Sequence, residues 1–316
     1  MPDRKPHLDG LAVLLLLACC ALWGINHVVT KLTLADVPPL IQAGVRSLGA
    51  ALLVVLWARA RGLSLSPRNG TLGAGLLAGA LFAAEFACIF VGLQYTNASR
   101  MIVFIYTAPF VVALGMPLLA GTERPSAVQL AGLSAAFAGV AWAFAEGLQS
   151  GAAPLAGNKQ WLGDALGVAA AVLWGGTTLT IRASRLAKAS PEQTLFYQLA
   201  VSGVLLVLAS LLAGEAWPSP LQLGARPLAL MAFQTVVVTF ASYLVWFWLV
   251  RHYPATQVSS FTLLTPLFGL LCGVWLLGET LTLRLAVACT AVVLGIALVN
   301  RAPARPAATP NQTPVT

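Results

Sequence analysis

The stretch Ala21-Leu22-Trp23-Gly24 lies in the first apolar segment of the chain, and Val172-Leu173-Trp174-Gly175 repeats its pattern in the second half. A second pair of motifs follows in the same order, Thr107-Ala108-Pro109-Phe110 and Leu264-Thr265-Pro266-Leu267. In both halves the proline motif precedes an apolar stretch and then a loop that contains a glutamate. Motifs that recur in one order predict an internal duplication, in which each copy forms the same structural unit.

The apolar segments around these motifs define the class of protein. Of the 316 residues, 59% are hydrophobic and 9% are charged, whereas soluble domains carry about a quarter charged residues. Such a chain cannot cover a surface in water, so we expect lipid to be its main solvent. The net charge of +8 does not predict nucleic-acid binding, because the basic residues lie in short loops and form no basic face with interleaved aromatic residues.

Apolar blocks of about twenty residues, the length that crosses a bilayer, recur along the whole chain. Only helices satisfy all their backbone groups alone in lipid, and no alternating barrel pattern occurs. We therefore predict an all-α integral membrane protein. Its ten spans are Leu11–Leu34, Pro39–Ala58, Leu72–Leu93, Ser99–Leu119, Ala127–Ala145, Trp161–Ile181, Thr194–Leu212, Leu228–Val250, Thr256–Leu277 and Leu283–Asn300.

The charges of the loops predict the orientation of these spans. Basic residues concentrate in cytoplasmic loops of membrane proteins, and an even number of spans places both termini on one side. With the termini inside, the inner segments hold Arg4, Lys5, Arg59, Arg61, Arg68, Arg124, Arg182, Arg185, Lys188, Arg251, Arg301 and Arg305. The outer segments hold only Lys31, Arg100, Lys159, Arg226 and Arg284. We expect a multi-pass protein of the bacterial inner membrane with both termini in the cytoplasm.

The duplication divides the chain into two five-helix repeats, residues 1–148 and 161–300, joined by the loop 149–160 and followed by a disordered cytoplasmic tail, 301–316. Five crossings are an odd number, so the second repeat inserts upside down relative to the first. Inverted repeats are typical of secondary transporters, whose solute site lies between the halves near the middle of the membrane. We therefore expect a central cavity and alternating access to it.

These same motifs, Trp-Gly early in each half and proline followed by Gly-Glu later, resemble those of the drug/metabolite transporter superfamily, specifically its EamA-type ten-helix branch. The resemblance covers roughly Leu11 to Asn300, and the chain is most similar to the bacterial aromatic amino-acid exporters of that family. It implies that helices three, four, eight and nine surround the cavity and that helices one, two, six and seven are the gating elements. Helices five and ten would be peripheral. Gly121-Thr122-Glu123 departs from the pattern by one inserted residue relative to Gly278-Glu279.

Glu85 is the acidic residue that lies well inside a predicted span. An acid at the bilayer centre costs about 2.5–3.5 kcal/mol, so it normally faces a cavity or a partner. It could bind the amine of a solute, carry a proton, or hold helices together as a neutral acid. Arg46, a base within a span, could snorkel to the surface, pair with Glu85 or clamp a solute carboxylate.

The remaining candidates are a polar stripe on spans one and six and the deep aromatic residues of spans four and eight. They could line a pocket for flat, amphipathic solutes, or they could hydrogen-bond neighbouring helices and form interfacial belts. Together with Glu85, the predicted solute-binding residues are Trp23, Asn26, His27, Tyr106, Trp174, Thr178, Ser242, Tyr243 and Trp246. Pro109 and Pro266 should kink spans four and nine and are candidate gating positions.

The predicted function is therefore secondary transport, namely export of small organic solutes, amino acids with aromatic or hydrophobic side chains included. Another metabolite or drug is the alternative substrate, and a channel or an intramembrane enzyme is the alternative class. We expect no catalytic residues, metal site or cofactor: the five cysteines lie in apolar segments without a CxxC spacing, and no phosphate-binding loop is present. The expected partners are a small-molecule substrate and membrane lipid, and the expected state is a monomer.

Overall fold

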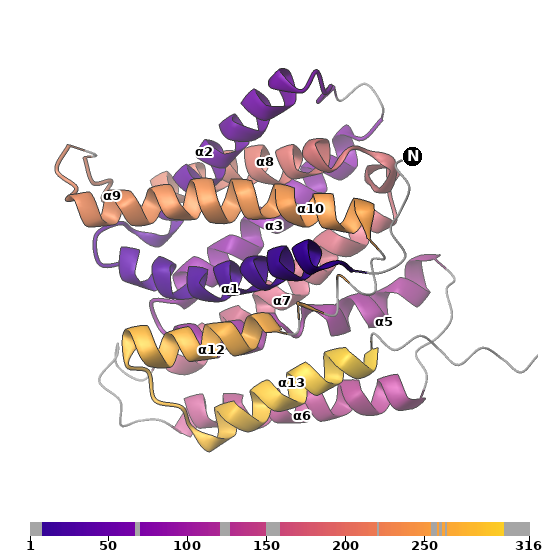
Figure 1. Cartoon of the computed structure of the whole chain (residues 1–316). Coiled ribbons are helices and arrows are strands. Elements are labelled where there is room, and N and C mark those ends of the chain that lie inside the picture. Colours follow the sequence, from indigo (N-terminus) through magenta and orange to yellow (C-terminus); the bar gives the residue numbers. More distant parts are fainter. Residues whose placement is uncertain are drawn as a thin grey trace, which may run out of the picture.

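The computed structural model describes residues 8–66, 70–120, 127–149, 159–219, 221–253, 258, 261–262 and 264–299. In these ranges the chain forms helices and no strands (Figure 1). The helices of the first half are α1 Gly10–Thr33, α2 Pro39–Ala60, α3 Leu72–Gly92, α4 Ala98–Ile105, α5 Ala108–Ala120 and α6 Ala127–Gln149. Those of the second half are α7 Gln160–Arg182, the 3₁₀ turn η2 Arg185–Lys188, α8 Pro191–Leu212, α9 Ala225–Ala232, the π-helix η3 Phe233–Ser242, α10 Tyr243–His252, α12 Leu264–Leu277 and α13 Leu283–Val299.

The length and hydropathy of these helices identify a multi-pass membrane protein. Seven helical stretches of the described residues are long and apolar enough to span a bilayer, and three shorter apolar helices accompany them. Large apolar side chains also point outward from the bundle, among them Trp275, which is 84% exposed, and Leu52, which is 60% exposed. A surface of this kind is suited to lipid rather than to water. The tail 301–316 and most of the loop 149–160 lie outside the described residues.

Both motif prolines lie in the first turn of a described helix. α4 ends at Ile105, a turn follows, and Pro109 is the second residue of α5. Pro266 is the third residue of α12. The first turn tolerates proline because its N–H groups have no partner within the helix. The fourth predicted span is therefore two helices separated by a break beside Tyr106.

The eighth predicted span contains a feature that its sequence did not indicate, a π-helix between α9 and α10. In η3 the hydroxyl of Thr239 donates to the carbonyl of Gln234, five residues earlier, at 2.8 Å. π-Helices are rare in proteins, and those that do occur are often found at functional sites. η3 ends at Ser242, directly before Tyr243, which faces the cavity described below.

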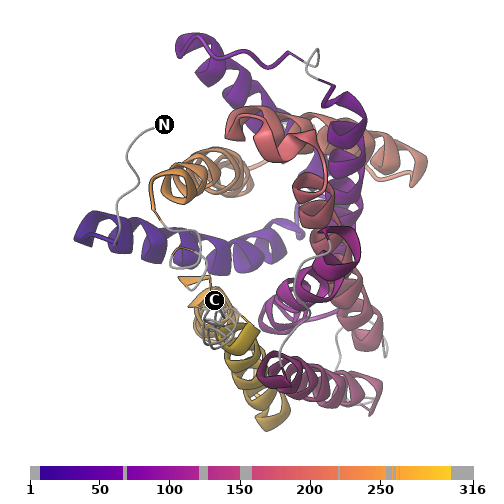
Figure 2. The same ribbon diagram turned by 90° about the vertical axis from the view of Figure 1, so that its right-hand side faces the viewer.

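The helices pack in pairs that join the two halves of the chain. α1 lies on α12, α2 on α8, α3 on α7, and α6 on α13. Figure 2 shows α6 and α13 at one edge of the bundle, away from α2 and α8. Glycines allow these close approaches: a Cβ on Gly24 of α1 would lie 2.7 Å from the backbone nitrogen of Gly269 in α12, and one on Gly295 of α13 would lie 2.8 Å from the carbonyl oxygen of Gly132 in α6.

Candidate functional site

A cavity of about 260 Å³ lies among α1, α3, α7, η3, α10 and the break between α4 and α5. With the exception of Thr178 and Ser242, all the predicted solute-binding residues line it, and so does Pro109. The residues that sequence reasoning missed are mostly apolar. The full lining is Trp23, Asn26, His27, Phe82, Glu85, Phe86, Ile89, Ile105, Tyr106, Pro109, Trp174, Gln198, Val238, Tyr243, Trp246, Phe247 and Thr262. Helical spacing around Glu85 could have identified Phe82 and Ile89.

Two groups of aromatic rings form much of this lining. The ring of Trp23 meets those of Tyr243 and Trp246 edge-on, with centroids 6.1 and 5.2 Å apart. Tyr106 and Trp174 make a similar contact at 5.4 Å. These are preferred geometries for aromatic pairs, so each ring is oriented by its neighbours. The cavity consequently presents rigid aromatic surfaces contributed by both halves of the chain.

Ser242 contributes to the site indirectly, through Trp23. The indole N–H of Trp23 donates to the Ser242 hydroxyl at 2.8 Å, and that hydroxyl donates to the carbonyl of Val238. Ser242 therefore holds the indole of α1 against η3. The hydroxyl of Thr178 donates to the carbonyl of Trp174 in its own helix at 3.1 Å, and Thr178 is absent from the cavity wall.

Thr30, which continues the polar stripe of Asn26 and His27 toward the C-terminal end of α1, belongs to a buried amide cluster rather than to the cavity wall. The Thr30 hydroxyl and the Gln42 side-chain NH₂ both donate to the amide oxygen of Gln234, at 3.2 and 3.3 Å. The amide NH₂ of Gln234 in turn donates to the hydroxyl of Thr33 at 3.2 Å. These bonds tie α1, α2 and η3 together. For Thr30 the structural alternative, hydrogen bonding between helices, therefore applies.

Glu85 lies in the cavity wall with only 5% of its surface exposed, and its Oε2 atom is enclosed without a hydrogen-bond partner. Arg46 is 1% exposed, and its guanidinium carbon lies 4.1 Å from the ring centroid of Phe86 and 5.0 Å from that of Phe90. Snorkelling of Arg46 to the surface is therefore contradicted. No ion pair between Arg46 and Glu85 is formed in the described part of the chain. The guanidinium of Arg46 instead makes cation–π contacts with the rings of Phe86 and Phe90.

A second pocket, of about 360 Å³, adjoins the cavity. Phe247 lines both, and Trp57, Arg61, Glu192 and His252 belong to the wall of the second pocket. These residues lie at or just beyond the C-terminal ends of α2 and α10 and at the N-terminal end of α8. Phe247 is thus the side chain that the walls of the two pockets share.

The opposite end of the bundle is closed by carboxylates that cap helices. α12 ends at Leu277, and the φ of +65° at Gly278 reverses the chain so that Glu279 turns back toward α4. The Glu279 carboxylate accepts the backbone N–H groups of Ala98 and Ser99 at 2.7 and 2.9 Å, which satisfies the free donors at the start of α4. The ammonium of Lys31, in the last turn of α1, lies 3.7 Å from the same carboxylate.

A Gly-Glu pair just after the end of α8 caps the start of α2 in the same way. Gly214 has a φ of +67°, and the Glu215 carboxylate accepts the N–H groups of Leu40 and Ile41 at 2.9 and 2.8 Å. Ser210 also donates to Glu215, at 2.6 Å. Sequence reasoning treated these glutamates as loop residues, although the positive-φ glycine before each one is the signal that directs its side chain back to the bundle.

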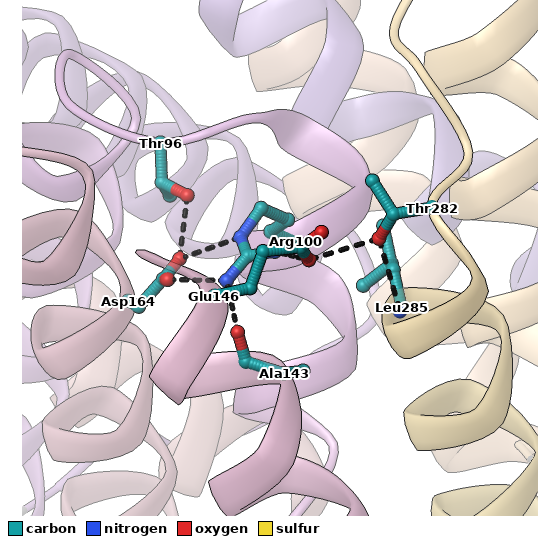
Figure 3. A network of polar contacts seen from close by, with 7 residues as sticks. All are labelled: Thr96, Arg100, Ala143, Glu146, Asp164, Thr282 and Leu285. Atoms are coloured by element: carbon teal, nitrogen blue, oxygen red, sulfur yellow. Dashed lines mark hydrogen bonds and ion pairs between the residues drawn. The ribbon is translucent and has the colours of Figure 1, made fainter. Parts of the chain in front are cut away.

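A buried ionic network completes this closed end (Figure 3). The guanidinium of Arg100 in α4 donates to both carboxylate oxygens of Asp164 in α7, at 3.1 and 2.6 Å, and to Glu146 in α6 at 2.9 Å. Thr96 also donates to Asp164, at 2.6 Å, and Thr282 donates to Glu146 at 2.9 Å. Arg100 was expected in an outer loop, yet it is 2% exposed. Its charge is compatible with burial because the two carboxylates face it.

The chain is similar to known membrane proteins over nearly its whole length. The uncharacterized transporter YvbV of Bacillus subtilis is 29% identical over 290 residues, which cover 91% of this chain and 90% of that protein. A probable amino-acid metabolite efflux pump of Salmonella typhimurium is 26% identical and covers 87% of this chain and 88% of its own length. A solved crystal structure with 21% sequence identity matches with a TM-score of 0.61 over 92% of this chain and 97% of that chain, which shows a shared fold.

The model of the EamA-like transporter family matches the chain twice, over residues 10–145 and over residues 161–301. The two matches cover both groups of helices and therefore the whole cavity. The chain accordingly belongs to the EamA-like transporter family.

Proposed function

We propose that this membrane transporter is a secondary exporter of small organic solutes in the bacterial inner membrane, and that amino acids with aromatic or hydrophobic side chains are among its substrates. The observation that carries the proposal is the cavity within the bundle, which is lined by aromatic rings around one enclosed acid, Glu85. Ligand pockets of proteins have this character, apolar walls with a few polar groups. The name of the Salmonella relative, an amino-acid metabolite efflux pump, supports the substrate class.

The proposed architecture is ten spans in two inverted halves, residues 1–148 and 161–300, in a monomer with both termini in the cytoplasm. The double family match supports two halves. The helix pairs also support a two-fold relation, because α1 packs on α12 just as α7 packs on α4 and α5. In each case the first span of one half lies against the fourth span of the other half. Inverted halves that meet at a shared cavity are a common basis for alternating access.

Two observations favour transport by alternating access. At one end, the second pocket meets the cavity at Phe247. At the other end, Glu279 and the Arg100 network join helices that must separate before a solute can leave. In this state a solute would enter from the side that loop charges place in the cytoplasm, as an exporter requires. Rocking of one group of helices against the other would then break the closed end.

Counterflow with the purified full chain in liposomes tests the proposed function. Vesicles loaded with Thr, Met, Phe, Trp or a nucleoside should accumulate the matching labelled solute, and Phe and Trp should give the highest rates. Glu85→Gln should lower these rates, whereas Asp36→Asn, the same change at an exposed loop position, should not. Absence of exchange with every solute in the reconstituted wild-type protein would refute the proposal. Full retention of proton-driven uptake and of counterflow in Glu85→Gln would assign that residue a purely structural role.

A further inference from the structure

We infer that the cavity recognises the primary ammonium group of its solute and makes no specific contact with a carboxylate, so that aromatic primary amines bind as well as aromatic amino acids do. This inference rests on the proposed function, because it takes the same cavity as the solute site. It goes further in that it names the chemical group on which binding depends.

Three enclosed polar atoms on residues of the cavity wall lack a hydrogen-bond partner, and the two oxygens among them are acceptors. Glu85 Oε2 and Asn26 Oδ1 are enclosed and have no hydrogen-bond partner, and the same holds for Nδ1 of His27, which accepts in one of its neutral tautomers. All three side chains are at least nine-tenths buried. Buried acceptors without donors are costly, and each one in a native structure requires an explanation. A primary ammonium brings three donors and no acceptor, which is the complement of this set.

The cation nearest to Glu85 is screened from the cavity. Arg46 is absent from the cavity wall, whereas Phe86, whose ring its guanidinium contacts at 4.1 Å, is part of the wall. The Nε and Nη2 groups of Arg46 are enclosed donors without a hydrogen-bond partner, but Arg46 does not line the cavity, so a solute carboxylate there meets the phenyl ring and not the guanidinium. Lys31 and Arg100 are already engaged with Glu279 and Asp164 at the closed end. Of the three roles that the sequence suggested for Arg46, a clamp on the solute carboxylate is thus disfavoured.

The aromatic rings of the wall favour the same group. Trp23 meets Tyr243 and Trp246 edge-on at the cavity wall, and the faces of these rings carry partial negative charge. Such faces attract an ammonium and repel a carboxylate. A solute with an aromatic ring would stack within the cavity while its ammonium donates charge-assisted hydrogen bonds to Glu85. The attraction to the ring faces and the hydrogen bonds to Glu85 both act on the amine end of an amino acid.

Three probes with the same phenylethyl skeleton separate the two groups: phenethylamine has only the amine, 3-phenylpropionate has only the carboxylate, and L-phenylalanine has both. Titration into the purified full chain, followed by tryptophan fluorescence, measures each dissociation constant, since Trp23, Trp174 and Trp246 line the cavity. We expect phenethylamine and L-phenylalanine to bind within about threefold of each other. We expect 3-phenylpropionate to bind about tenfold more weakly or worse, as the loss of a charged hydrogen bond predicts.

Variants assign this preference to the acceptors. Glu85→Gln should weaken phenethylamine and L-phenylalanine about tenfold or more and leave 3-phenylpropionate unchanged, while Asp36→Asn should change nothing. If Glu85→Gln fails to fold, Asn26→Ala removes a second acceptor without a change of charge and should weaken the same two ligands. Arg46→Lys should leave the ratio of phenethylamine to L-phenylalanine affinity unaltered.

Binding and transport can fail separately. If the probes bind in the expected order but counterflow is absent, the proposed function is wrong and the ammonium site stands. If 3-phenylpropionate binds as tightly as phenethylamine, or if Arg46→Lys selectively weakens the carboxylate ligands, the ammonium inference is overturned even when transport is observed.

Discussion

Replacement of Asp164 by asparagine is the sharpest test of the buried network at the closed end of the bundle. Asp164 is fully buried, and it accepts two hydrogen bonds from Arg100 and one from Thr96. The asparagine side chain has nearly the same shape but carries no charge, and it offers one acceptor oxygen in place of two. The substitution therefore leaves the Arg100 guanidinium with Glu146 as its remaining carboxylate partner.

The expected loss of stability follows from this geometry. Removal of one partner from a buried ion pair costs about 3–5 kcal/mol because the other charge remains buried. Glu146 still neutralises part of the Arg100 charge, which places the expected cost at the lower end, about 3 kcal/mol. At about 2.1 cal/mol/K of unfolding entropy per residue, 1 kcal/mol shifts the Tm of a 316-residue chain by about 1.5 °C, so Asp164→Asn should lower Tm by about 4–5 °C.

Thermal unfolding in detergent, followed by the fluorescence of the nine tryptophans, measures this shift. The double variant Arg100→Met with Asp164→Leu removes both charges, so it should recover much of the loss, because apolar replacements of whole buried pairs are often tolerated. Asp36→Asn serves as the exposed control. An unchanged Tm in Asp164→Asn would refute the assignment of Arg100 and Asp164 as a buried pair. So would a double variant whose loss of stability exceeds the summed losses of the two single variants.

Two further predictions concern the ends of the bundle. Glu279→Gln and Glu215→Gln each weaken a helix cap by about 1 kcal/mol, and each should lower Tm by about 1–2 °C. Only Glu279→Gln should also change the counterflow rate, because that glutamate joins α12 to α4 and to Lys31. Equal effects of the two variants on transport would contradict a gating contact at Glu279. Phe247→Ala should raise the rate of solute exchange about threefold or more, because it opens the cavity to the second pocket. A lower rate of counterflow would show that the Phe247 ring binds the solute instead of obstructing its path.

The sequence predicted the helices well where a long apolar run carried the signal. α1, α2, α3, α7 and α8 begin and end within a few residues of the predicted spans, since the thickness of the bilayer sets their length. The breaks were not predictable in the same way. The turn before Pro109 and the π-helix in the eighth span change the path of the chain without changing its hydropathy. The equivalent region before Pro266 lies mostly outside the described residues.

For the candidate site, residue type was a good guide and the partners of each residue were not. Glu85 stood out because an acid in an apolar span is costly, and the structure places it in the wall of the cavity. Thr30 and Thr178 looked similar in sequence, yet one bonds across helices to Gln234 and the other bonds within its own helix. Ser242 touches the cavity only through Trp23.

The amino-acid sequence alone determined that this chain is a duplicated, multi-span helical membrane protein, because hydropathy and repeated motifs are local properties that need no neighbour. Only the tertiary structure decided which polar groups are paired and which are left free. Arg46 stacks on Phe86, Arg100 is buried against Asp164, and Glu85 keeps an unpartnered oxygen. The physical reason is that contacts between helices depend on the rotation and crossing of each pair, which are set by packing over the whole bundle.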